Sequence, residues 1–114
     1  IIDTADQTCK ISAEVKNFEP EQYLDKKEAR RMDRFTQFAM VAAKQAYEDA
    51  NLASAQIDPE RFSVVIGTAS GGVRAIERQH MEALQKGFRR VSPFFVPSML
   101  SDLAGGNVSI AFNA

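Results

Sequence analysis

The clearest pattern in the sequence is a helical spacing of apolar residues between Phe35 and Ala50. Apolar side chains recur there every three or four positions, which places them on one face of a helix. Asp33 stands where a helix cap belongs, since its carboxylate can accept from a free backbone N–H. Asn51 suits the left-handed residue that ends a helix. We therefore predict a helix over this stretch.

Two further helices follow from the same spacing. One covers 73–86, with Gly87 as its stop. Another begins at Pro97 and reaches about Ala111, and its apolar residues lie on several sides, which predicts a buried helix. Gly105 and Gly106 fall inside it, where each costs about 1 kcal/mol relative to alanine. We expect another backbone to approach closely at this pair, because only glycine leaves room for it.

Two segments have the pattern of strands. Residues 10–15 alternate polar and apolar, as in a half-buried strand, whereas 62–67 are mostly apolar and β-branched, as in a central strand covered on both faces. Short turns are predicted at Pro20 and at 57–60. A helix between strands is typical of layered α/β domains, so the predicted fold class is α/β.

The composition fits one small globular domain. The chain has 114 residues, 45% hydrophobic and 25% charged, a balance that excludes disorder as a description of the whole chain. Its net charge of −1 argues against a nucleic-acid-binding protein, because phosphate affinity comes mainly from cations. No apolar run approaches the roughly 20 residues of a membrane helix, and no secretory pattern is visible. We expect a cytoplasmic protein that contacts neither nucleic acid nor membrane.

The chain has one cysteine, Cys9, and one histidine, His80. This excludes an intrachain disulfide, a zinc site with several cysteines and any catalytic scheme that needs two imidazoles. Cys9 lies in a polar N-terminal stretch, not at a strand-to-helix turn or a helix start where nucleophilic cysteines are found, and His80 lies among charged residues. We predict no catalytic residue, no metal ion and no cofactor.

The glycine loop at 67–72 begins like a phosphate-binding loop and then departs from one. Val73 occupies the position of the phosphate-binding lysine, and Arg74 that of the magnesium-binding hydroxyl. A dinucleotide-binding pattern fails too, since Ala69 breaks the glycine spacing. Two interpretations stay open: glycines that let backbone pack against backbone, or a glycine-lined substrate pocket at the end of a strand.

Two short basic clusters interrupt an otherwise balanced chain. They are the run at 26–31 and the pair Arg89-Arg90. Such an uneven field suits an acidic partner, although a basic run is also typical of a solvated helix start. Phe94 and Phe95, flanked by prolines, belong either to the core or to a rigid aromatic contact at an interface.

Three motifs in order resemble the discrete β-ketoacyl-[acyl-carrier-protein] synthase II family, the condensing enzymes of bacterial fatty acid synthesis. They are KKEARRMDRF at 26–35, VIGTASGG at 65–72 and RRVSPFFVP at 89–97. The resemblance implies a thiolase-like, layered α-β-α-β-α fold and a homodimer. It implies an acyltransferase that joins an acyl thioester to malonyl-carrier protein by a decarboxylative Claisen condensation, with a cysteine nucleophile and two histidines.

The sequence departs from this family pattern at its most reactive positions. The nucleophile turn, both histidines and the first strand of the family have no match here, and Ile1 takes the place of an initiator Met. We expect residues 1–114 to be an internal part of the N-terminal half of a ketosynthase domain, inactive by itself. Three alternatives stay open: a ketosynthase of a polyketide pathway, a silent relative, or a non-catalytic module that binds an acidic carrier protein.

The resemblance assigns roles to seven residues of this chain. The expected partner is an acyl carrier protein with phosphopantetheine-linked acyl and malonyl groups, a negatively charged helical bundle. Residues that match its contacts are Lys27, Arg30, Arg31, Arg89 and Arg90. Ser70 falls where family members often carry a bulky aliphatic gate to the acyl pocket, and Phe95 matches an aromatic that reaches across the dimer. The helix at 98–112 is expected near the dimer interface.

Overall fold

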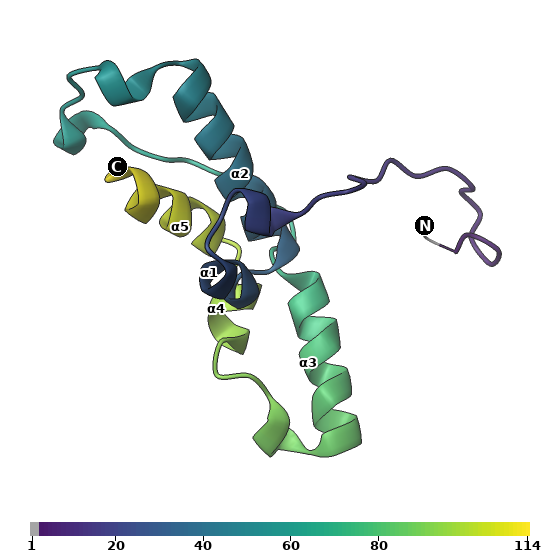
Figure 1. The fold of residues 1–114 in the computed structure, drawn as a ribbon. Helices are drawn as coiled ribbons and strands as arrows, with labels where there is room; N and C mark the ends of the chain where they lie inside the picture. Colours follow the sequence, from purple (N-terminus) through teal and green to yellow (C-terminus); the bar gives the residue numbers. More distant parts are fainter. Residues whose placement is uncertain (1–2) are drawn as a thin grey trace.

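The centre of the molecule is a long helix, α2, with α5 packed against it (Figure 1). The computed structural model describes residues 3–114, so the missing initiator Met concerns a position outside the described residues. The α-helices are α1 (Lys26–Arg31), α2 (Arg34–Asp49), α3 (Val73–Lys86), α4 (Phe95–Met99) and α5 (Leu103–Phe112). Short 3-10 turns are η1 (Pro20–Gln22), η2 (Leu52–Ser54), η3 (Pro59–Arg61) and η4 (Phe88–Arg90).

The helices predicted at 35–50 and 73–86 are confirmed. α2 has Asp33 at its N-cap position, although the Asp33 side chain makes no capping hydrogen bond. Asn51 follows α2 with φ 51° and ψ 37°, the predicted left-handed conformation. Gly87 ends α3 with φ 87°, which an L side chain rarely adopts. The turns predicted at Pro20 and 57–60 are present as η1 and η3.

The prediction of a single helix from Pro97 to Ala111 is wrong, because the helix is interrupted at Leu100. Leu100 is extended, with φ −68° and ψ 130°, so α4 and α5 are separate helices. In a continuous helix the carbonyl of Met99 would accept from Leu103 N–H. Instead it accepts from Gly72 N–H at 3.0 Å. A loop from earlier in the chain therefore takes the bond that would continue the helix.

The two predicted strands are not confirmed in the part of the chain that the structure describes. Residues 10–15 and 62–67 have no strand assignment, and no backbone hydrogen bond joins 63–67 to another described residue. A strand is stabilised by hydrogen bonds to a neighbouring strand, and neither segment has one beside it. The predicted α/β layering is thus not seen within residues 3–114. Exposure still alternates along 62–67: Phe62, Val64 and Ile66 are half-buried, whereas Val65 is 94% exposed.

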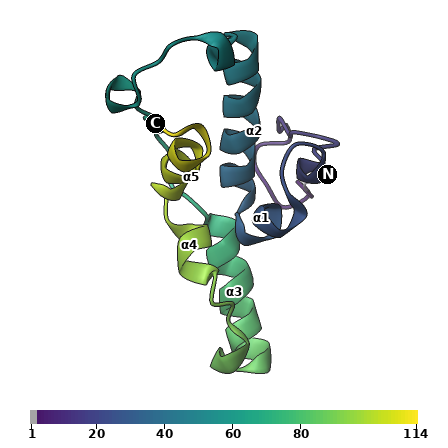
Figure 2. The same cartoon turned by 60° about the vertical axis from the view of Figure 1, so that its left-hand side comes forward.

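Buried residues concentrate where α2 meets α5 and where α3 meets α4. The first contact contains Met40, Val41 and Val108, and the rings of Tyr47 and Phe112 extend it with centroids 4.6 Å apart. α3 and α4 run away together from the α2–α5 pair, as both views show (Figures 1 and 2). The described molecule is elongated as a result, with extents of 51 × 38 × 25 Å.

Arg34, the first residue of α2, holds the N-terminal arm onto the helices. Its guanidinium carbon lies 4.8 Å from the centre of the Phe38 ring and 5.2 Å from that of Phe18. Its Nη2 also donates to the carbonyl of Val15 at 3.0 Å. The described residues before Val15 extend away from the helices, as the purple segment of Figure 1 shows.

Candidate functional site

The first basic cluster is the short helix α1. Its cap is Asp25, whose Oδ1 accepts from the backbone N–H of Lys27 at 2.8 Å and of Glu28 at 3.3 Å. Ala29 is buried, whereas Lys27 and Arg30 are exposed. The arginines of the last turn lie at the negative end of the helix dipole, which favours cations there. α1 therefore presents its positive charges to solvent from a capped helix.

Arg31 at the end of α1 stacks on a residue from a distant part of the sequence. Its guanidinium carbon lies 4.8 Å from the centroid of the Phe94 ring. A guanidinium over an aromatic ring is attracted to the ring and still carries N–H donors for an anion. Phe94 is therefore an exposed aromatic contact, as one interpretation of this pair predicted. Phe95 is half-buried at the start of α4, which is closer to the other interpretation, a core residue.

Arg31 and Phe94 also form the rim of a groove between α1, α2, α4 and α5. The groove has a volume of about 420 Å³. Its apolar lining includes Met40, Pro97 and Leu103. The basic end of α1 therefore borders an apolar surface.

The second basic cluster lies apart from the first. Arg89 and Arg90 are exposed on η4, which follows α3 at the end away from α1 (Figures 1 and 2). The residues predicted to contact one acidic partner thus fall into two surfaces. The structure brings together Lys27, Arg30 and Arg31 on one helix, and Arg89 and Arg90 on one turn.

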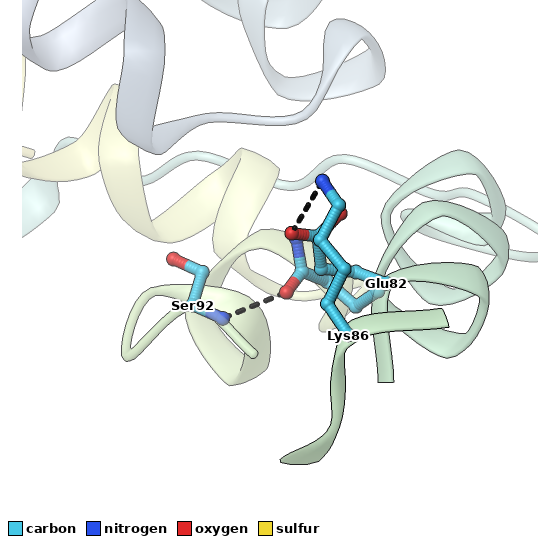
Figure 3. Close-up of polar contacts among 4 residues, drawn as sticks. Glu82, Lys86 and Ser92 are labelled. Atoms are coloured by element: carbon cyan, nitrogen blue, oxygen red, sulfur yellow. Dashed lines mark hydrogen bonds and ion pairs between the residues drawn. The ribbon is translucent and has the colours of Figure 1, made fainter. Parts of the chain in front are cut away.

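A partly buried hydrogen bond, which the sequence analysis missed, anchors the segment that follows the Arg89–Arg90 pair. Gln79 on α3 is 8% exposed, and its Oε1 accepts from Ser92 N–H at 2.7 Å. Figure 3 shows the bond from Ser92 to this helix, beside the ion pair of Lys86 and Glu82. A sequence pattern could have indicated it: Gln79 is a polar residue at helical spacing between Ala75 and Ala83 on the face where α3 is buried.

The glycine loop packs tightly against the end of α4. A Cβ added to Gly72 would lie 2.2 Å from the carbonyl oxygen of Ser98, and one added to Gly71 would lie 2.7 Å from that of Met99. Gly71 also has φ +56°. Close backbone packing is therefore confirmed for these two glycines. At Gly105, where it was predicted, a Cβ would come only within 4.0 Å of a backbone nitrogen, which is ordinary contact.

The two residues assigned to an acyl pocket lie near opposite ends of α4. Ser70 is exposed in the glycine loop, which contacts the end of α4, and Phe95 is half-buried at its start. Neither side chain lines the groove beside Arg31. A pocket between Ser70 and Phe95 stays a prediction.

The remaining candidates for chemistry lie on different elements. Cys9 is exposed in the N-terminal arm, where its Sγ donates to the carbonyl of Ile11 at 3.4 Å, and His80 is exposed on α3. Within residues 3–114, no group of three or more His, Cys, Asp or Glu side chains is arranged to hold a metal ion. Among the described helices, none is both long and apolar enough to cross a membrane.

Comparison with known proteins gives consistent matches. Residues 3–114 match the family described as Beta-ketoacyl synthase, N-terminal domain. A 3-oxoacyl-[acyl-carrier-protein] synthase 2 of Staphylococcus aureus is 49% identical over 113 residues, which are 99% of this chain and 28% of that protein. The protein of the same name from Synechocystis is 43% identical over 112 residues, which are 98% of this chain and 27% of that one. The chain thus spans little more than a quarter of these relatives.

A similar fold is found among solved structures, and one of them illustrates it. It is a type II PKS acyl-carrier protein in complex with its ketosynthase bound to the hexaketide, and it superposes with a TM-score of 0.76 over 86% of this chain and 28% of that one. The sequence identity is 21%, so the match concerns the fold alone.

Proposed function

Because this chain belongs to the β-ketoacyl synthase N-terminal domain family, we propose that it is part of a 3-oxoacyl-[acyl-carrier-protein] synthase of fatty acid synthesis. The observation that carries the proposal is the 49% identity over 99% of the chain to a relative of that name. In the proposed reaction, malonyl-carrier protein loses CO2 and the resulting carbanion attacks an acyl thioester on the enzyme. A carbon–carbon bond forms as the acyl carbon–sulfur bond breaks, and the enzyme thiol is released. The product is a 3-oxoacyl-carrier protein, two carbons longer than the acyl group.

The residues of this chain have a supporting role in that reaction. Neither Cys9 nor His80 matches the reactive cysteine or the histidines of the family. The chain instead supplies partner-binding surface and walls of the acyl pocket. The chemistry therefore depends on parts of the protein outside the range that this chain spans in its relatives.

The α1 cations form the principal docking surface for an acidic acyl carrier protein. Lys27 and Arg30 are exposed, and Arg31 is held in place by Phe94 and still carries N–H donors for a carboxylate or a phosphate. Preordered cations lose little side-chain freedom on binding, which favours affinity as well as steering. Arg89 and Arg90 form a second contact, and a carrier protein that reaches both clusters must extend along the α4 side of the molecule.

Ser70 and Phe95 face the acyl group from the two ends of α4. The tight packing of Gly71 and Gly72 on Ser98 and Met99 supports this role, because it fixes the loop that carries Ser70. A serine in place of an aliphatic gate leaves more room, and a more polar wall, for the acyl chain.

The layered α/β fold, the homodimer and the cytoplasmic location belong to the same proposal. In the complete fold, residues 62–67 pair as a central strand. The support is their apolar, β-branched sequence together with the solvent-exposed side chain of Val65. An apolar side chain of this kind is stabilised when another segment buries it.

The proposal is tested with the full-length gene product. It is incubated with an acyl-carrier protein and malonyl-carrier protein, and the products are identified by mass spectrometry. We expect a 3-oxoacyl-carrier protein and one CO2 for each condensation. Failure to condense any acyl-carrier substrate would overturn the proposal, and a product that keeps several keto groups would favour the polyketide alternative.

A further inference from the structure

We propose that Gln79 is a positioning residue, whose bond to Ser92 sets the location of the Arg89–Arg90 pair and of Phe95 relative to α3. The functional part of this inference rests on the proposed function. Gln79 projects from the buried face of α3, between Ala75 and Ala83. The small alanines let the chain at Ser92 approach, and the glutamine then satisfies its backbone N–H at 2.7 Å.

Ser92 also makes hydrogen bonds to the residues that follow it, and it follows closely the turn that carries the two arginines. Its N–H is bound to Gln79, its Oγ accepts from Phe94 N–H at 3.1 Å, and its carbonyl accepts from Phe95 N–H at 3.0 Å. This bond from Phe95 N–H is made by the first residue of α4. A single residue thus fixes the start of α4 and the end of the turn that carries the two arginines.

Within the described part of the chain, the turn η4 packs along α3 and makes only local backbone hydrogen bonds of its own. Its own bonds are local, from Arg90 N–H to the carbonyl of Gly87 at 3.0 Å and from Val91 N–H to that of Phe88 at 3.1 Å. Phe88 is 84% exposed, so it does not anchor the turn in the core. Gln79 therefore provides the side-chain tether between this turn and α3.

Loss of the tether has three consequences. Ser92 N–H is left without its partner in a partly buried position, which favours conformations that expose it to water. The two arginines then lose their fixed position, and binding of an acidic partner weakens although neither cation has been altered. Phe95 loses its fixed orientation through the same residue.

The test uses four variants of the full-length gene product. Gln79→Met keeps the length and the helix propensity but removes the acceptor. Gln79→Asn keeps an amide but shortens the side chain, so the bond is lost without emptying the site. Gln79→Glu restores an acceptor oxygen in either protonation state. Gln85→Met is the matched control, since Gln85 is exposed on the same helix.

Two readouts are measured for each variant, with thermal unfolding as a check of folding. Hydrogen exchange at Ser92 N–H is expected to accelerate about tenfold or more in Gln79→Met and Gln79→Asn. The KM for the acyl-carrier substrate is expected to rise about fivefold with kcat within about twofold, because ground-state binding is what weakens. Gln79→Glu recovers both readouts, and Gln85→Met changes neither.

The outcomes separate this inference from the proposed function. Unchanged exchange at Ser92 in Gln79→Met and Gln79→Asn overturns the positioning role. Faster exchange with an unchanged KM overturns its link to carrier-protein binding. If the unaltered protein condenses nothing, the proposed function fails, and the exchange measurement still decides whether Gln79 is the tether. Where Gln79→Met does not fold, Gln79→Asn supplies the same comparison.

Discussion

The guanidinium of Arg31 and the ring of Phe94 stack 4.8 Å apart, and this pair joins α1 to the segment that leads into α4. The contact orders one cation of the proposed docking surface, at the end of α1, and partly covers an aromatic side chain that would otherwise lie open to solvent. It also connects the two basic clusters structurally, because Phe94 follows the anchored residue Ser92.

Breaking the Arg31–Phe94 pair should lower stability by the energy of one cation–π contact. In a double-mutant cycle of Arg31→Met and Phe94→Leu, we expect a coupling of about 0.5–1 kcal/mol in the free energy of unfolding, measured by urea denaturation. The matched cycle replaces Arg31 by the exposed Arg30 of the same helix and should give no coupling. Equal coupling in both cycles would show that the effect comes from charge and not from stacking.

Charge reversal on α1 should weaken binding of an acidic carrier protein. The triple variant Lys27→Glu, Arg30→Glu, Arg31→Glu is expected to raise the Kd about tenfold or more at low salt, with a smaller effect at high salt because mobile ions screen the charges. Titration calorimetry at two salt concentrations measures it.

A control for the triple variant makes the same change of charge elsewhere. It reverses the exposed residues Lys10, Lys16 and Arg61, which lie on the N-terminal arm and on η3. If the control weakens binding as much as the α1 variant does, the net charge matters and α1 is not the docking surface.

The glycines should respond in opposite ways to alanine. Gly72→Ala places a Cβ 2.2 Å from the Ser98 carbonyl, so we expect a loss of about 3 kcal/mol in the free energy of unfolding. Gly106→Ala adds a Cβ in the middle of a helix, where no described atom outside its chain neighbours and its own helix backbone lies within 4 Å, and should gain about 0.5–1 kcal/mol. Chemical denaturation compares the two. A destabilised Gly106→Ala would mean that another segment of the protein covers that face of α5.

Ser70→Ile should narrow the acyl pocket. Four heavy atoms replace two at the proposed gate, so kcat/KM for the longest acyl substrates is expected to fall about tenfold, with short substrates little affected. Product profiles from a mixture of acyl-carrier substrates, read by mass spectrometry, measure the change. Ala69→Ile, at the exposed neighbouring position, is the control. An unchanged profile for Ser70→Ile would remove Ser70 from the pocket.

The helices α2 and α3 could be predicted from the sequence, because their hydrogen bonds and end signals are local. The limits of α3 follow from its apolar spacing and from Gly87, and α2 likewise begins after Asp33. The break at Leu100 could not be foreseen, because it depends on Gly72 N–H, which arrives from another part of the chain. The strand predicted at 62–67 is not confirmed for a related reason, since a strand exists only beside a partner and the described residues supply none.

The candidate site was predictable in its chemistry but not in its arrangement. The sequence indicated that the two basic clusters are surface cations, and their side chains are exposed on α1 and η4. Their separation, the stacking of Arg31 on Phe94 and the Gln79 anchor depend on how α3 and α4 pack, which spacing along the sequence does not specify. Ser70 and Phe95 keep their assigned roles as predictions.

The uncovered side of residues 62–67 has a consequence during biosynthesis. Extended apolar backbone with free hydrogen-bonding groups is a template for other copies, so nascent or truncated chains that display it are prone to aggregate.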